Sequence, residues 1–425
     1  MNPQASDHYI QILKEELIPA LGCTEPIAIA YAAAKAREVL GCFPETAILE
    51  CSGNIVKNAK SVTVPYTGGL VGIRASMLAG LVGGKAEYKL EVLSAFTPRH
   101  MTVVRELLDC NFGEVKLLST ESNLHLILQV AAQQDRVTVE IKDNHSHICK
   151  ITKNDQIIYQ PEVDREPNSG SNANRQDLSV KDIYEFANTV SLGKVSSLLA
   201  RQIEYNMRIA DEGLSGDYGI NIGRILLPSA HNKDVQAKIK AYAAAASEAR
   251  MSGCILPVIT NSGSGNQGIT TSIPVIVYAR EKGLSEESLY RGLVFSNLLN
   301  IHQKTSIGRL SAFCGAVSAA CASGAAITYL AGGNLEQINQ TITNTLANVS
   351  GIVCDGAKPS CAAKIASCLD AAYLSHVLAM EGKSYQAGNG ILKADVEETI
   401  AAVGRIAYKG MRATDIEILE IMLEA

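Results

Sequence analysis

The spacing of apolar residues changes twice along this chain of 425 residues, and those changes limit the folds that it can adopt. The beginning and the second half have the spacing of helices, whereas the stretch between them alternates with the period of two that is typical of β-strands. We therefore expect an α+β fold, in which residues 1–42 and 178–425 form a mainly helical domain. A smaller α/β domain of residues 45–160 is inserted between them, and residues 161–177 form a polar, turn-rich linker.

The inserted domain has a predicted element order of β-α-β-β-β. Its helix covers residues 98–110, which have the spacing of an amphipathic helix. Alternating or β-branched residues predict strands at 47–51, 61–64, 89–96, 114–118, 124–130, 136–141 and 148–151.

Composition and charge argue against a nucleic-acid partner. The chain has 38 basic and 43 acidic residues, a net charge of −5, so it lacks the basic excess that binds a phosphate backbone. Aromatic residues make up only 5% and tryptophan is absent, which leaves few rings on which bases could stack. We expect no nucleic acid among its partners and a small molecule as its ligand.

No membrane partner is expected either. Residues 1–8 lack the basic and apolar stretches of a signal peptide. The uncharged stretch 310–335 is rich in Ala, Gly, Ser and Cys, which favours a buried, closely packed helix over a lipid-facing one. We expect a cytoplasmic protein, and the sequence is also compatible with a homo-oligomer.

The chain has eleven cysteines. Because we expect a reducing cytoplasmic compartment, a disulfide framework is not the expected role for them. Most are interpreted as small buried apolar residues. Cys314, Cys354 and Cys361 lie near breaks between helices, and Cys361 falls in the first turn of a predicted helix, where free N–H groups stabilise a thiolate. Thiolates in such positions suit iron–sulfur ligation, although ordinary core cysteines explain the same spacing.

Helix geometry limits the ligands that each helix can offer. Cys321 follows Cys314 by seven residues, and Cys368 follows Cys361 by the same spacing, which is about 10 Å along a helix axis. One helix therefore supplies one ligand to a compact cluster. We choose Cys314 and Cys361 because they are nearer to the helix breaks.

Cys23 is a candidate for catalysis. Thr24 is a suitable N-cap and Pro26 lies in the first turn of the helix that follows, so the thiol precedes a helix N-terminus. We expect its pKa to be lowered there. A small residue at a tight turn is the alternative interpretation.

Two polar loops that contain glycine are typical of anion-binding backbone. Ser52 and Asn54 belong to the first, and Asn261, Ser262 and Ser264 belong to the second. Small polar side chains and free backbone N–H groups of this kind can hold a carboxylate, so we interpret these five residues as substrate-binding.

The second loop also matches the G-x-G-x-x-G pattern of dinucleotide-binding folds at Gly263, Gly265 and Gly268. We reject that interpretation, because residues 269–278 are β-branched and contain Pro274, and we do not expect a helix there.

Four further residues have two interpretations each. His302 and Lys304 lie shortly before Cys314 and either face the substrate or form a solvated turn. His145 and His147 are placed on one face of a strand, where they could bind a metal, but we interpret them as a polar face.

Together these strings resemble the iron–sulfur L-cysteine desulfidase family, which is related to the α part of bacterial iron–sulfur L-serine dehydratases. The resemblance runs in order over nearly the whole chain. It rests on Gly22-Cys-Thr-Glu-Pro26, Ser52-Gly-Asn-Ile-Val-Lys-Asn58, Asn261-Ser-Gly-Ser-Gly-Asn-Gln-Gly268, Gly308-Arg-Leu-Ser-Ala-Phe-Cys-Gly315 and Cys354-Asp-Gly-Ala-Lys-Pro-Ser-Cys361.

The resemblance implies a [4Fe–4S] cluster with one open iron, held by Cys314, Cys354 and Cys361. It makes Cys23 the general base and the two glycine loops the site for the substrate's carboxylate and amine. Cys23 favours the desulfidase branch, because the related dehydratases have a different sequence around a serine there. The surplus of cysteines leaves Cys321 and Cys368 as stand-in ligands.

The implied activity is that of a carbon–sulfur lyase, which converts L-cysteine to hydrogen sulfide, ammonia and pyruvate by β-elimination. Its nearest rival is an iron–sulfur L-serine dehydratase that uses the same cluster. A non-catalytic amino-acid-binding protein is a second alternative. A pyridoxal phosphate enzyme is a third, for which the chain offers lysines such as Lys304 and Lys358 but no clear phosphate site.

Overall fold

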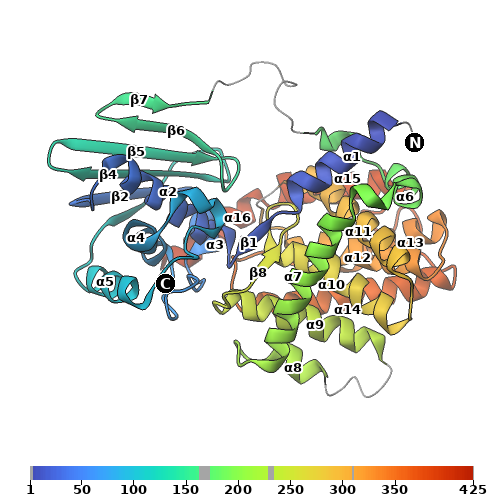
Figure 1. Cartoon of the computed structure of the whole chain (residues 1–425). Coiled ribbons are helices and arrows are strands. Elements are labelled where there is room, and N and C mark those ends of the chain that lie inside the picture. Colours follow the sequence, from blue (N-terminus) through green and yellow to red (C-terminus); the bar gives the residue numbers. More distant parts are fainter. Residues whose placement is uncertain (1–2, 162–172, 228–233, 309–310, 425) are drawn as a thin grey trace.

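The computed structural model describes residues 3–161, 173–227, 234–308 and 311–424. It has the predicted α+β fold, with a sheet-containing part and a helical part side by side (Figure 1). The strand predictions at 47–51, 114–118, 124–130, 136–141 and 148–151 and the helix at 98–110 are confirmed to within two residues. Of the predicted linker, residues 162–172 lie outside the described residues.

The described strands of the first part form one mixed sheet in the order β3-β2-β4-β5-β6-β7. Strands β2 and β3 are parallel, and every other neighbouring pair is antiparallel. Apolar residues alternate along β4 and β5, so one face of the sheet is buried under helices. The strands are β2 (Thr46–Cys51), β3 (Glu114–Leu117), β4 (His125–Ala132), β5 (Asp135–Lys142), β6 (Ile148–Lys153) and β7 (Gln156–Tyr159).

Helix α2 (Thr24–Leu40) packs on this sheet and against α4 (Ile73–Gly83), and its alanine-rich sequence is almost entirely buried. A Cβ atom on Gly80 would lie 2.2 Å from the carbonyl oxygen of Ala30, so the two helices touch backbone to backbone. Of the two helices described within residues 1–42, α1 (Pro3–Glu16) belongs to the helical core and α2 does not. The predicted grouping of residues 1–42 with the helical domain is therefore wrong for α2, because helical spacing identifies a helix but not the layer that it covers.

Three local predictions differ from the structure. Residues 61–64 form no strand and make one isolated bridge, between Thr63 and Val71. Residues 89–96 lie in the 3₁₀ helix η1 (Ala86–Glu91) and the turns after it, because the alternating pattern of so short a run does not outweigh tertiary packing. The short helix α3 (Gly53–Ala59) and strand β7 were not expected.

The helical part is built around α12 (Gly315–Leu330), which packs against α10 (Gly265–Glu281), α11 (Glu286–Ile307), α13 (Leu335–Val349) and α14 (Cys361–Met380). Helix α12 is the buried, closely packed helix that the uncharged sequence predicted. Around this core lie α6 (Val180–Thr189), α7 (Ser196–Ser215), α8 (Ile222–Leu226), α9 (Val235–Met251), α15 (Val396–Arg405) and α16 (Arg412–Glu424). Among the described helices, none is long and apolar enough to cross a membrane.

Helix α10 corrects the prediction for residues 269–278. It continues through Pro274 and its β-branched residues, nearly all of which are buried. Burial in the helical core therefore outweighs their weak helix propensity. The G-x-G-x-x-G string does precede a helix, but the strand before it, β8 (Pro257–Ile259), pairs only with the antiparallel β1 (Pro19–Leu21) among the described strands and forms no βαβ unit.

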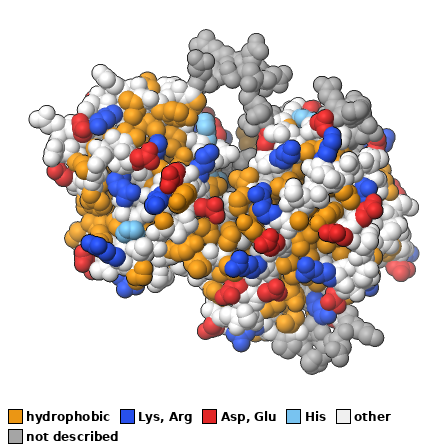
Figure 2. Space-filling view, in the orientation of Figure 1, with side chains coloured by type: hydrophobic (Ala, Val, Ile, Leu, Met, Phe, Trp, Pro, Cys, Tyr) orange, Lys and Arg blue, Asp and Glu red, His pale blue; other side chains and the backbone are white. Residues whose placement is uncertain are grey.

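Charges are mixed over the surface. On the face shown in Figure 2, Lys and Arg side chains alternate with Asp and Glu over both parts of the molecule. The net charge of −5 is thus not gathered into one acidic patch on this face.

Candidate functional site

The N-termini of α2, α10, α12 and α14 converge on one cavity of about 110 Å³ at the boundary between the two parts. Each contributes lining residues from its first turn or its cap. Because the first N–H groups of a helix lack helical partners and carry the positive end of its dipole, this arrangement favours anions in the cavity.

Cys314 and Cys354 are brought together by a short antiparallel bridge between Phe313 and Val353. The backbone N–H of Cys314 donates to the carbonyl of Ile352 (3.0 Å), and that of Cys354 donates to the carbonyl of Ala312 (2.6 Å). Side chains one residue beyond the bridging pair lie on the same face as diagonal neighbours. Both thiols therefore face the cavity although 40 residues separate them in sequence.

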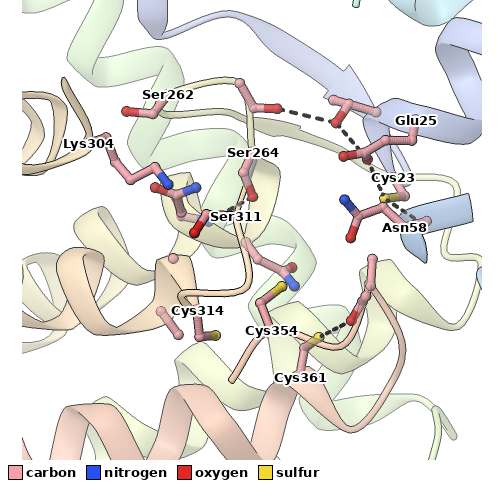
Figure 3. A pocket seen from close by; sticks show the side chains of 18 of the residues that line it. Cys23, Glu25, Asn58, Ser262, Ser264, Lys304, Ser311, Cys314, Cys354 and Cys361 are labelled. Atoms are coloured by element: carbon pink, nitrogen blue, oxygen red, sulfur yellow. Dashed lines mark hydrogen bonds between the residues drawn. The ribbon is translucent and has the colours of Figure 1, made fainter. Parts of the chain in front are cut away.

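Cys361 is the first residue of α14 and lines the same cavity. Its thiol donates to the carbonyl of Gly356 at 3.6 Å, within the loop that also carries Cys354. Figure 3 shows Cys314, Cys354 and Cys361 together on one side of the cavity, with Cys23 and Glu25 across it. The structure thus brings together the predicted ligands with the predicted base.

Electrostatics favour a thiolate in this group. A hydrogen bond from the Cys314 thiol and the charges of Lys57 and Lys364 lower the pKa of Cys354. The same hydrogen bond, together with burial, raises the pKa of Cys314. Lys364 lies nearby because its ammonium donates to the carbonyl of Val353 at 2.8 Å.

The three thiols are the type of donor that an iron–sulfur cluster takes, and they line one cavity. Within the described ranges, no three His, Cys, Asp or Glu side chains are grouped closely enough to hold one metal ion. A four-iron cluster places each thiolate on a different iron, so its ligands must surround a cavity rather than meet at a point. Cys321 and Cys368 are fully buried and do not line the cavity, and the Cys321 thiol faces the carbonyl of Ile342 (3.9 Å).

Cys23 is the N-cap residue of α2, and its thiol donates to Oε2 of Glu25 at 3.0 Å. The expectation of a lowered pKa is wrong. Burial and the Glu25 carboxylate raise the pKa of Cys23 well above its usual value. Desolvation of a thiolate and repulsion by a neighbouring carboxylate outweigh the helix N-terminus.

Residues that were not predicted as site residues also line the cavity. Glu25 stands two residues after Cys23, and this nearness was the one available signal. Arg250 lies in the last turn of α9 with only 2% of its surface exposed. The Arg250 guanidinium donates to Oδ1 of Asn266 at 3.1 Å. Asn58 and Gln267 complete the polar lining.

His145 corrects an interpretation. It lies in the turn after β5 rather than on a strand, is 5% exposed, and lines the cavity. Its Nε2 is 3.6 Å from Oε1 of Glu25. His147, in the same turn, is exposed. The sequence could not distinguish them, because a turn changes which side chains face inward.

The second polar loop lies at the cavity. Ser262 and Ser264 line it, as does Lys304 from α11. Asn261 lies behind them, where its amide donates to Oδ1 of Asn297 at 2.9 Å. The hydroxyl of Thr24 donates to the carbonyl of Gly263 at 3.2 Å and ties the start of α2 to this loop.

Three predicted substrate residues lie elsewhere. Ser52 and Asn54 line a second cavity of about 720 Å³ between α3 and α16, where the Asn54 amide donates to Oδ2 of Asp415 at 2.9 Å. His302 points away from the cysteines, and its Nε2 is 2.6 Å from Oε2 of Glu397 on α15.

Known proteins resemble this chain over nearly its whole length. The sequence model of the serine dehydratase alpha chain family matches residues 74–420. A UPF0597 protein of Treponema denticola is 52% identical over 422 residues, which cover 98% of both chains. One from Lachnoclostridium phytofermentans is 51% identical over 414 residues, 97% of this chain and 99% of the relative. One from Bacteroides fragilis is 38% identical over 420 residues, 97% of each.

Proposed function

Because the chain belongs to the serine dehydratase alpha chain family, a family related to iron–sulfur lyases, we propose that it is an L-cysteine desulfidase. One observation carries the proposal: the thiols of Cys314, Cys354 and Cys361 line the same cavity as the thiol of Cys23. The first three would hold a [4Fe–4S] cluster, and the fourth would act on the substrate.

When bound, the cluster would supply a Lewis-acidic open iron, which attracts the sulfur of the substrate. The chain's own residues do the rest. Arg250, Ser262 and Ser264, with the helix N-termini, would bind and orient the carboxylate so that the Cα–H bond faces Cys23. Cys23, as thiolate, would take the Cα proton. The substrate then loses sulfide, and aminoacrylate hydrolyses through its imine to pyruvate and ammonia.

The test is anaerobic purification with analysis of iron and sulfide, combined with sulfide release from L-cysteine. We expect about four irons per chain and turnover. Cys23→Ala should keep the iron and lose turnover, whereas Cys354→Ala should lose both. Turnover by protein with less than about one iron per chain would contradict the cluster, and equal iron loss in both variants would make Cys23 a ligand.

L-Serine is the second candidate substrate, and the family description favours it. The comparison is pyruvate release from L-serine against sulfide release from L-cysteine by the same anaerobic preparation. A larger kcat/KM for serine would make the protein a dehydratase. Tight binding of either amino acid without any turnover would instead favour a binding protein.

A further inference from the structure

Across the cavity from the proposed ligand cysteines, three titratable side chains from two separate segments of the chain lie next to one another. The Cys23 thiol is 3.0 Å from Oε2 of Glu25, and Oε1 of Glu25 is 3.6 Å from Nε2 of His145. All three are buried, with 3%, 6% and 5% of their surfaces exposed. The Glu25 carboxylate thus lies between the thiol and the imidazole, with one oxygen facing each of them.

The surroundings hold Glu25 in this bridging position. The hydroxyl of Thr24, which also faces the carbonyl of Gly263, lies 3.2 Å from Oε2, the oxygen that also receives the thiol. His145 Nε2 is buried and makes no hydrogen bond to any residue that the structure describes. The 3.6 Å from this nitrogen to Oε1 of Glu25 is a distance that a small side-chain shift would convert to a hydrogen bond.

We propose that Glu25 and His145 form a proton relay that activates Cys23, with Glu25 and His145 as positioning residues. The inference rests on the proposed function, in which Cys23 is the general base. His145 comes from the turn between β5 and β6, and Cys23 and Glu25 stand at the start of α2, so the α/β part supplies all three groups to a cavity that it shares with the helical part.

The relay moves one proton over two short steps. The S–H bond of Cys23 breaks, and its electron pair stays on sulfur. The proton passes to Oε2 of the Glu25 carboxylate, the carboxyl turns so that this O–H faces the imidazole, and the lone pair of His145 Nε2 takes the proton. The thiolate then accepts the Cα proton of the substrate, and the imidazolium returns its proton to the leaving sulfide or to water.

Charge balance explains why a relay is needed here. Burial and Glu25 raise the pKa of Cys23, so a thiolate formed without a partner would put two negative charges side by side in a dry cavity. Transfer to His145 leaves the net charge of the three groups at −1, and the Arg250 guanidinium balances it. The other titratable group facing Arg250 is Cys361, on the ligand side.

The experiment tests the relay in two ways, by the kinetics of turnover and by the reactivity of the Cys23 thiol in protein that does not turn over. Variants Glu25→Gln, Glu25→Asp and His145→Asn are compared in anaerobic kinetics with L-cysteine and in iron content. In iron-free protein, alkylation of Cys23 by iodoacetamide is followed against pH by peptide mass spectrometry. The matched control is His147→Asn, an exposed histidine in the same turn.

In Glu25→Gln and His145→Asn we expect kcat to fall about 100- to 10,000-fold, with KM within about threefold and iron unchanged. Glu25→Asp should retain more activity than Glu25→Gln. The alkylation midpoint of Cys23 should fall in Glu25→Gln, which removes a negative charge, and rise in His145→Asn, which leaves the carboxylate uncompensated. His147→Asn should behave like the wild type.

Alkylation midpoints that are unchanged in both variants would overturn the relay, whatever the substrate. So would full kcat in His145→Asn, or iron loss in both Glu25→Gln and Glu25→Asp, which would show a structural role. If the wild type does not turn over cysteine but the midpoints shift in opposite directions, the relay stands and the proposed substrate fails.

Discussion

Gly356→Ala is expected to displace the cysteine loop, which is the loop from Cys354 to Cys361, from the other residues of the site. Gly356 has φ 97°, and a Cβ atom there would lie 2.2 Å from the carbonyl oxygen of Lys57. That oxygen is backbone within α3, and the Lys57 side chain is 1% exposed and paired with Asp415, so it cannot move aside cheaply. The loop that carries Cys354 and leads to Cys361 must shift by about 1 Å to restore an ordinary contact.

The magnitude has two parts. A left-handed backbone costs a residue other than glycine about 1–2 kcal/mol, and overpacking against the carbonyl adds about 1–3 kcal/mol. Gly332→Ala is the matched control, because Gly332 has φ 84° and nothing within 4 Å of its Cβ position. It should show the first cost only.

The assays are urea unfolding and iron content after anaerobic reconstitution. Gly356→Ala should be less stable than Gly332→Ala by about 1–3 kcal/mol and should bind less than half the iron of the wild type. Equal stability and equal iron in the two variants would refute the reasoning that Lys57 and the cysteine loop fix each other.

Two further outcomes follow from buried residues outside the cavity. Cys321→Ala and Cys368→Ala should each keep the full iron content and lose about 1 kcal/mol of unfolding free energy, whereas iron loss in either would identify it as a ligand. Burial lowers the pKa of His376 from 6.5 to about 4. The unfolded chain therefore binds more protons between these values, and stability should fall by about 2 kcal/mol from pH 7 to pH 5, as measured by urea unfolding. His376→Gln should lack this difference, and an equal pH dependence in the variant would contradict the buried neutral histidine.

The fold class followed from the period of apolar residues, but the assignment of layers did not. Helix α2 is buried on nearly every side, so its sequence shows no face that could identify its partner. Residues 269–278 illustrate the opposite problem, because their β-branched sequence suggested extended structure although tertiary burial keeps them in α10. Both differences arise from contacts distant in sequence, which a local pattern does not record.

The candidate site could be predicted only in part from the sequence, because some of its residues come together through contacts distant in sequence. Cysteines next to helix breaks could be chosen because breaks place side chains at helix ends, and helix ends converge here. Arg250 and His145 stand in no such pattern. They reach the cavity from the last turn of α9 and from a turn of the sheet, and only contacts between segments distant in sequence place them at the cavity that Glu25 lines.

The family match and the catalytic proposal do not cover the same residues. The match begins at residue 74, so it includes the three cysteines proposed as ligands, His145 and Arg250 but neither Cys23 nor Glu25. Membership in the family therefore supports the cluster more directly than it supports the base. Because the preference for a thiol or a hydroxyl leaving group also depends on how the Cα proton is removed, α2 is the segment on which cysteine or serine specificity should be tested first. Exchanging Cys23 for Ser is the sharpest form of that test. If the cavity alone sets specificity, the ratio of kcat/KM for the two amino acids should stay constant while both values fall.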